Sequence, residues 1–161
     1  MAGDPRAGSY VKDPDGTLLQ FNESGEINPA TSILQYPKTA SVEGLQPVFR
    51  PKRLDRVTVS VTKLDRCAEL YRKLCGPEMR RSNSELVFRL GAGTLVVRES
   101  QSSKHHGIDH FGVLVERYDH RSVPSRMKAL GAELQIDAEN SLTHFTDPDG
   151  IRVNITERPA D

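Results

Sequence analysis

The chain has 161 residues, enough for one folded domain of ordinary size and a further segment. Its 22 Lys and Arg residues balance its 22 Asp and Glu residues, so the net charge is zero when the histidines are neutral. A balanced charge gives no electrostatic attraction to nucleic acid or anionic lipid, and no apolar run approaches the roughly 18 residues of a membrane-spanning helix. We therefore expect neither a nucleic acid nor a membrane as partner.

The N-terminal sequence MAGDPRAGSY lacks the apolar stretch of a secretory signal, so a cytoplasmic protein is expected. Cys67 and Cys75 lie eight residues apart on a predicted helix. That separation is about 12 Å along a helix axis, which is too far for a disulfide. Both cysteines are expected to be thiols.

A hairpin is predicted over residues 1–21, because two short strand-like runs flank the turn Asp13-Pro14-Asp15-Gly16. Residues 22–52 follow, rich in Pro, Ser, Thr and Glu and without sustained periodicity. This composition is typical of a linker.

A regular pattern starts at Arg53. Alternating apolar residues predict a strand over Leu54–Val61, and apolar residues at helical spacing predict a helix that ends at Gly76. Three short strand-like segments come next, near Met79, at Glu85–Leu90 and at Thr94–Glu99.

The same order of elements then returns. A strand is predicted at Ile108–Val115, a helix that ends at Gly131, and three further strands at Glu133–Ile136, Leu142–Thr146 and Ile151–Thr156. The first strands and the helix ends recur at nearly the same separation along the chain. This indicates an internal duplication, with modules at 53–100 and 107–157.

Two tandem βαβββ units, the opening strand IDHFGVLV and the ending FTDPDGIRVNI together resemble the vicinal-oxygen-chelate superfamily. Its members include glyoxalase I, bleomycin- and fosfomycin-resistance proteins, extradiol dioxygenases and methylmalonyl-CoA epimerase. The resemblance covers residues 53–157 and implies an α+β fold whose paired modules form an open, barrel-like cleft for small molecules. Because the N-terminal hairpin carries the same turn, it resembles the end of a preceding module.

The resemblance also implies four metal-ligand positions, one on the first and one on the last strand of each module, usually His and Glu. Here they hold Arg56, Val96, His110 and Asn154, and a second alignment of the first module gives Val97 in place of Val96. A guanidinium cannot ligate a metal because it stays protonated, and one imidazole with one amide oxygen holds a transition metal weakly. We therefore expect no metal and no other cofactor.

His110 is the candidate catalytic acid or base, and Arg56 is the candidate clamp for a carboxylate or phosphate. Structural alternatives remain open: an inherited cleft histidine without chemistry, and an ion pair of Arg56 with Asp55 or Asp109. The expected substrate-binding residues are Arg56, Val96, His110, His144 and Asn154. The neighbouring pair His105-His106 is interpreted as part of a polar loop and not as a metal site.

These ligand positions favour a glyoxalase/bleomycin resistance/dioxygenase-like protein with a degenerate metal site that binds a small oxygenated or anionic metabolite. The alternative is an active metal-dependent lyase, isomerase or dioxygenase of the same superfamily, with the chemistry in a missing upstream module. Whether the chain is an enzyme stays open at this point. The oligomeric state is open too, with a homodimer among the options, and the sequence does not identify the substrate.

Overall fold

The computed structural model describes residues 9–21, 47–102, 106–137 and 142–157. In chain order the elements are β1 (Ser9–Lys12), β2 (Leu18–Phe21), β3 (Pro51–Val61), α1 (Leu64–Cys75), β4 (Arg80–Arg81), β5 (Glu85–Leu90), β6 (Gly93–Glu99), β7 (Gly107–Val115), α2 (Val123–Ala129), β8 (Gln135–Asp137), β9 (Leu142–Thr146) and β10 (Arg152–Glu157).

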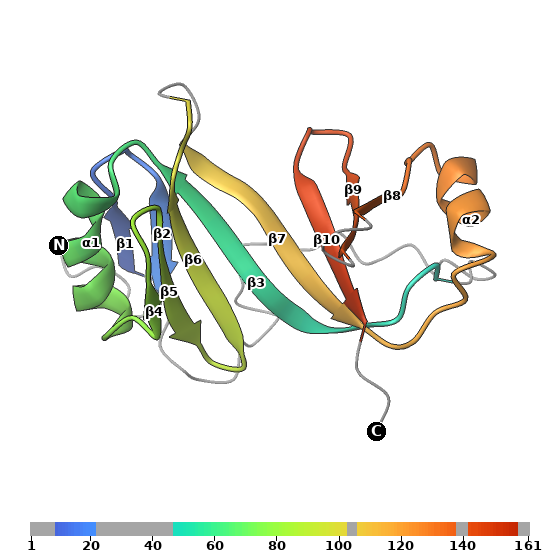
Figure 1. Cartoon of the computed structure of the whole chain (residues 1–161), viewed down its shortest axis with the longest axis horizontal. Coiled ribbons are helices and arrows are strands. Elements are labelled where there is room, and N and C mark those ends of the chain that lie inside the picture. Colours follow the sequence, from blue (N-terminus) through green and yellow to red (C-terminus); the bar gives the residue numbers. More distant parts are fainter. Residues whose placement is uncertain (1–8, 22–46, 103–105, 138–141, 158–161) are drawn as a thin grey trace, which may run out of the picture.

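Eight strands form one sheet in the order β4-β5-β6-β3-β7-β10-β9-β8 (Figure 1). At its centre the first strands of the two modules, β3 and β7, pair antiparallel. Each first strand also pairs parallel with the last strand of its own module, β3 with β6 and β7 with β10. The α+β fold and the repeated βαβββ order predicted from the sequence are therefore present, and the sheet is open.

The start of the first module differs from the prediction. β3 begins at Pro51, which pairs with Val115 of β7, so residues 51 and 52 belong to the sheet and not to a linker. Residues 22–46 of the expected linker lie outside the described part of the chain.

One apolar cluster lies on the α1 side of the first module. Alternation along β3 places Val57, Val59 and Val61 on that side, and α1 buries Leu64, Cys67, Ala68 and Tyr71 against it. Both cysteines are free thiols.

A smaller cluster lies in the second module. Its buried members are Val115, Val153 and Ile155, and partly buried aromatic residues surround them: Phe49, Phe111, Tyr118 and Phe145. The seven-residue α2 contributes two buried side chains, Val123 and Met127. Among the described residues, neither helix has the length and apolar character needed to cross a membrane.

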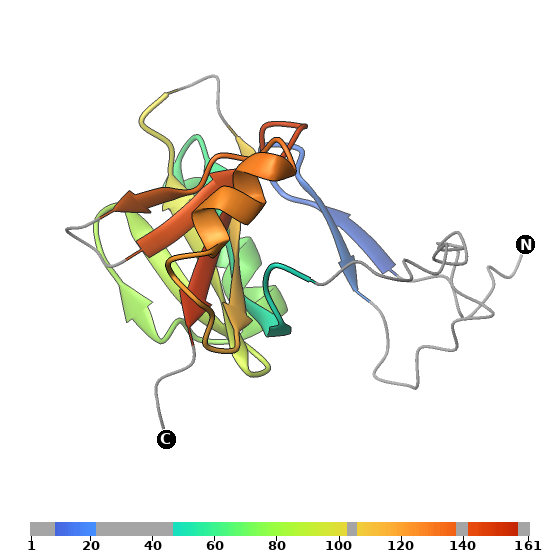
Figure 2. The same ribbon diagram turned by 90° about the vertical axis from the view of Figure 1, so that its right-hand side faces the viewer.

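β1 and β2 form a separate antiparallel hairpin, which extends away from the eight-stranded sheet in Figure 2. Its contacts are with the first module of the same chain. Leu19 packs on the first cluster, the Tyr71 hydroxyl donates to Asp13 at 3.0 Å, and Asp15 accepts from the backbone N–H of Thr62 at 2.6 Å. The hairpin is thus held by an apolar contact and two carboxylates.

The two Asp-Pro-Asp-Gly turns have the same hydrogen bonds. In the first, one oxygen of Asp13 accepts from the N–H groups two and four residues later, at 3.0 and 2.8 Å. In the second, Asp147 does the same at 3.0 and 2.8 Å. The fourth residue is Gly16 or Gly150, with φ of 92° and 87°, a conformation that favours glycine. The sequence likeness therefore reflects one local structure.

Candidate functional site

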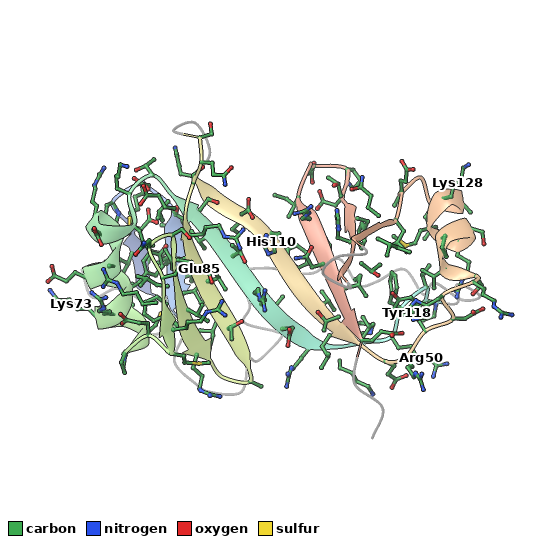
Figure 3. The ribbon with its side chains drawn as sticks, viewed as in Figure 1. Arg50, Lys73, Glu85, His110, Tyr118 and Lys128 are labelled. Carbon is green, nitrogen blue, oxygen red and sulfur yellow. The ribbon has the colours of Figure 1, made fainter. Side chains whose placement is uncertain are left out.

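The residues predicted to form the site share one face of the sheet. Because side chains alternate along a strand, Arg56 and Thr58 point away from the first apolar cluster, as His110 and Asn154 point away from the second. This side of the eight-stranded sheet is called the site face below. His110 lies on β7 at the middle of the sheet (Figure 3).

Strand register arranges the site face in two adjacent rows. One row runs across four strands: Val96, Thr58, His110 and Arg152. The next row runs across six strands: Thr94, Arg56, Gly112, Asn154, His144 and Gln135. All five residues singled out in the sequence lie on this face, with four strand spacings of about 4.8 Å each between Val96 and His144.

The register also distinguishes Val96 from Val97. Val96 pairs with Thr58, and Asn154 pairs with Gly112. Thr58 and Gly112 are equivalent, because each lies two residues after a first-strand ligand position. Val96 is therefore the first-module counterpart of Asn154, whereas Val97 belongs to the apolar cluster.

His110 is buried and hydrogen bonded through both ring nitrogens. Nδ1 lies 2.6 Å from Oδ2 of Asp109, and Nε2 lies 3.0 Å from Oγ1 of the fully buried Thr58. With the proton on Nδ1, the imidazole donates to Asp109 and accepts from the Thr58 hydroxyl. Asp109 thereby fixes the orientation of the ring.

Arg56 has an exposed side chain and, among the described residues, no acidic partner. The two acids considered from the sequence pair elsewhere, Asp55 with Arg53 at 3.3 Å and Asp109 with His110. Next to Arg56 in the row lies Gly112, where a Cβ would be 3.4 Å from the Arg56 Cβ. Gly112 and Asn154 are both buried, whereas the side chain of Arg56 is exposed.

The second-module end of the row is a polar cluster. Asn154 is buried, and its Oδ1 has no hydrogen-bond partner in the described part of the chain. His144 pairs with it across the strands, and its Nε2 lies 3.0 Å from Oε1 of Gln135 and 3.1 Å from Nη2 of Arg152. A buried acceptor without a partner costs about 1–3 kcal/mol.

Thr58, Arg152 and Gln135 were not predicted from the sequence. Each acquires its place through the pairing of strands far apart along the chain, with no local motif to mark it. Asp109 was considered only as a partner for Arg56, although it directly precedes His110.

The described residues contain no group of three His, Cys, Asp or Glu side chains arranged to hold a metal ion. His106 belongs to the described chain and is exposed, whereas His105 lies outside it. At the four ligand positions, Arg56 and Val96 carry no metal-binding atom.

No family model matches the sequence, and no curated protein matches it. Among solved structures, the homoprotocatechuate 2,3-dioxygenase from Brevibacterium fuscum is similar with a TM-score of 0.53 and 13% identity, over 70% of this chain and 38% of the dioxygenase chain. The 2,3-dioxygenase LapB from Pseudomonas sp. KL28 has a TM-score of 0.50 and 19% identity, over 70% and 42%. The methylmalonyl-CoA epimerase from Mycobacterium tuberculosis has a TM-score of 0.49 and 17% identity, over 73% and 95%.

At these identities the two dioxygenases establish the fold. It is the glyoxalase/dioxygenase fold that the sequence resemblance implied. The chain spans about two fifths of the length of either dioxygenase chain.

Proposed function

We propose that this chain binds a small oxygenated anion, a carboxylate in the first instance, on the site face without a metal ion. The observation that carries the proposal is the exposed guanidinium of Arg56, without an acidic partner among the described residues and one strand away from the buried His110. Arginine is well suited to such a ligand, because its planar fork donates two parallel hydrogen bonds to a carboxylate.

The other residues of the site face support the same class of ligand. Gly112 places no side chain between Arg56 and Asn154, and the buried Oδ1 of Asn154 has no hydrogen-bond partner among the described residues. Arg152 adds a second positive charge next to His110 in the register.

The absence of a metal ion is part of the proposal and has its own argument. Arg56 would repel a cation, Val96 has no donor atom, and both nitrogens of His110 already have hydrogen-bond partners. Converting Arg56→His, Val96→Glu and Asn154→Glu together should restore four donors with His110 and create measurable affinity for Mn²⁺ or Zn²⁺. Calorimetry that detects no binding to this variant would mean that the ligand positions are wrongly assigned.

One neighbour suggests a probe. The Brevibacterium fuscum dioxygenase was solved as a complex with 3,4-dihydroxyphenylacetate, a carboxylate with two vicinal oxygens. Titration of this compound into the chain, followed by calorimetry, should show binding that needs no added metal and survives a chelator. Catechol, which lacks the carboxylate, should bind more weakly.

Two variants test the site: Arg56→Ala removes the proposed clamp, and Arg81→Ala is its matched control. Losing the charge-assisted hydrogen bonds of Arg56 should weaken binding about tenfold, or ~1.5 kcal/mol. Arg81, on the edge strand β4 and paired with Asp65, should leave affinity unchanged when replaced. Equal affinity of wild type and Arg56→Ala would contradict the site. One Fe, Mn, Ni or Zn per purified chain would favour the metal-dependent enzyme instead.

A further inference from the structure

The second module contains an apolar cavity of about 410 Å³ between α2 and the sheet, and this cavity is open to solvent. Every described residue that lines it is apolar, including Phe49 from the entry to β3, Val113, Phe145 and Val153 from the sheet, and Met127 from α2. These residues belong to the face opposite the site face. The cavity is therefore separate from the site of the proposed function.

In the first module the longer helix α1 packs on the corresponding face of the sheet. Tyr71 is fully buried there and stacks on Phe88 with a centroid distance of 6.3 Å. α2 is five residues shorter than α1, and Leu130, which follows it, is 67% exposed. The volume of the cavity falls within the roughly 300–1,000 Å³ of small-molecule sites.

A second hollow of about 200 Å³ adjoins the cavity at Val48 and is positively charged. Three arginines line it, Arg50, Arg117 and Arg126, against one acid, Asp119. A carboxylate oxygen of Glu116 lies 3.8 Å from Nη1 of Arg50, and the same carboxylate forms a closer ion pair with Lys52. Arg117 forms no ion pair with any described residue. Figure 3 shows Arg50 beside Tyr118 where β7 and β10 end.

We propose that this second site binds a single-chain fatty acid. The acyl chain lies in the cavity between α2 and the sheet, and the carboxylate lies in the adjoining hollow at Arg50 and Arg117. The charge argues for an acid and not for a neutral hydrocarbon, because guanidinium groups bind carboxylates in pairs of hydrogen bonds. The cavity lining contributes no polar group that would favour a more polar ligand.

Chain length gives the first test. Hexanoate, octanoate and decanoate, each below its micellar concentration, are titrated into the full chain by calorimetry. Burial of one methylene group contributes about 0.8 kcal/mol, so affinity should rise about fourfold for each added methylene group until the cavity is full. Decanol should bind more weakly than decanoate. Equal affinity across the series, or equal affinity of the alcohol, would overturn the proposal.

NMR of the methionine methyl groups locates the ligand. Met127 lines the cavity, whereas Met79 lies in the first module and is 53% exposed. Decanoate should shift the Met127 methyl signal in proportion to occupancy and leave the Met79 signal in place. A shift of Met79 alone would place the ligand elsewhere.

Two pairs of variants test the cavity and the positively charged hollow independently. Ala132→Leu should fill part of the cavity and reduce decanoate affinity at least tenfold, while Ala129→Leu on the exposed side of α2 should not. Arg117→Ala should weaken the binding of decanoate about tenfold. Arg121→Ala should not, because Arg121 lines neither the cavity nor the hollow.

A concentration-dependent dimer that is abolished by Ala132→Leu would instead assign the cavity to a second copy of the chain. None of these outcomes depends on ligand binding at Arg56.

Discussion

The two modules of the sheet share one strand topology but differ in how completely a helix covers the apolar face. In the first, the twelve-residue α1 buries four side chains, and the N-terminal hairpin adds Leu19 and two carboxylates at its side. In the second, the seven-residue α2 buries two side chains and leaves a cavity beneath it. The pairing of strands is thus maintained without a complete helical layer, and the incomplete layer leaves apolar surface that a ligand can use.

The largest effect is expected from truncating one core side chain in each module. Tyr71→Ala removes a fully buried ring and its hydrogen bond to Asp13, so it should lower the free energy of unfolding by about 3–5 kcal/mol. Met127→Ala borders the solvent-open cavity and should cost about 2 kcal/mol, the lower end for its type. Urea unfolding followed by circular dichroism measures both, and equal losses would show that the modules are packed alike.

A moderate effect is expected at the two similar turns. Asp15→Ala leaves the Thr62 N–H without its acceptor and should lower stability by about 1–3 kcal/mol, whereas the equivalent Asp149→Ala, at an exposed position, should change it little. The double variant Asp15→Ala with Leu19→Ala should release the hairpin to limited proteolysis. Resistance equal to wild type would mean that other contacts hold it.

Acid should mimic the Asp15 variant. Burial raises the pKa of Asp15, but the hydrogen bonds from Thr62 and the charge of Arg66 outweigh it and hold the pKa below its usual value. A carboxyl whose pKa is lower in the folded state stabilises it fully above the ordinary carboxyl pKa. That contribution is lost as the pH falls through the lowered value. The stability difference between wild type and Asp15→Ala should therefore shrink at acid pH.

The smallest effect concerns the thiols, both of which lie in the first module. Burial, with the charges of Asp15 and Asp13, raises the pKa of Cys67 to about 11, and burial also raises that of Cys75. At pH 8 iodoacetamide should label Cys67 at least tenfold more slowly than the unfolded chain, as followed by mass spectrometry. Because the second module has no cysteine, the rate reports opening of the first module alone. Fast labelling of the native chain would contradict its tighter packing.

Periodicity in the sequence was sufficient for the order of the elements, because alternating and helical spacing mark strands and helices locally. The site was only partly predictable. Arg56, His110 and Asn154 were found because they align with ligand positions of a known superfamily, whereas Thr58 and Arg152 enter through cross-strand register. The cavity beneath α2 could not be predicted, because a sequence does not show which apolar residues are in contact with one another.

The outer edges of the sheet have a consequence for association between copies. An unpaired edge strand is a template on which another chain can add, and proteins avoid this with short strands and charged residues. Here β4 consists of two residues, both exposed arginines, and β8 has three residues. Edge-to-edge aggregation is therefore disfavoured at both ends of the sheet.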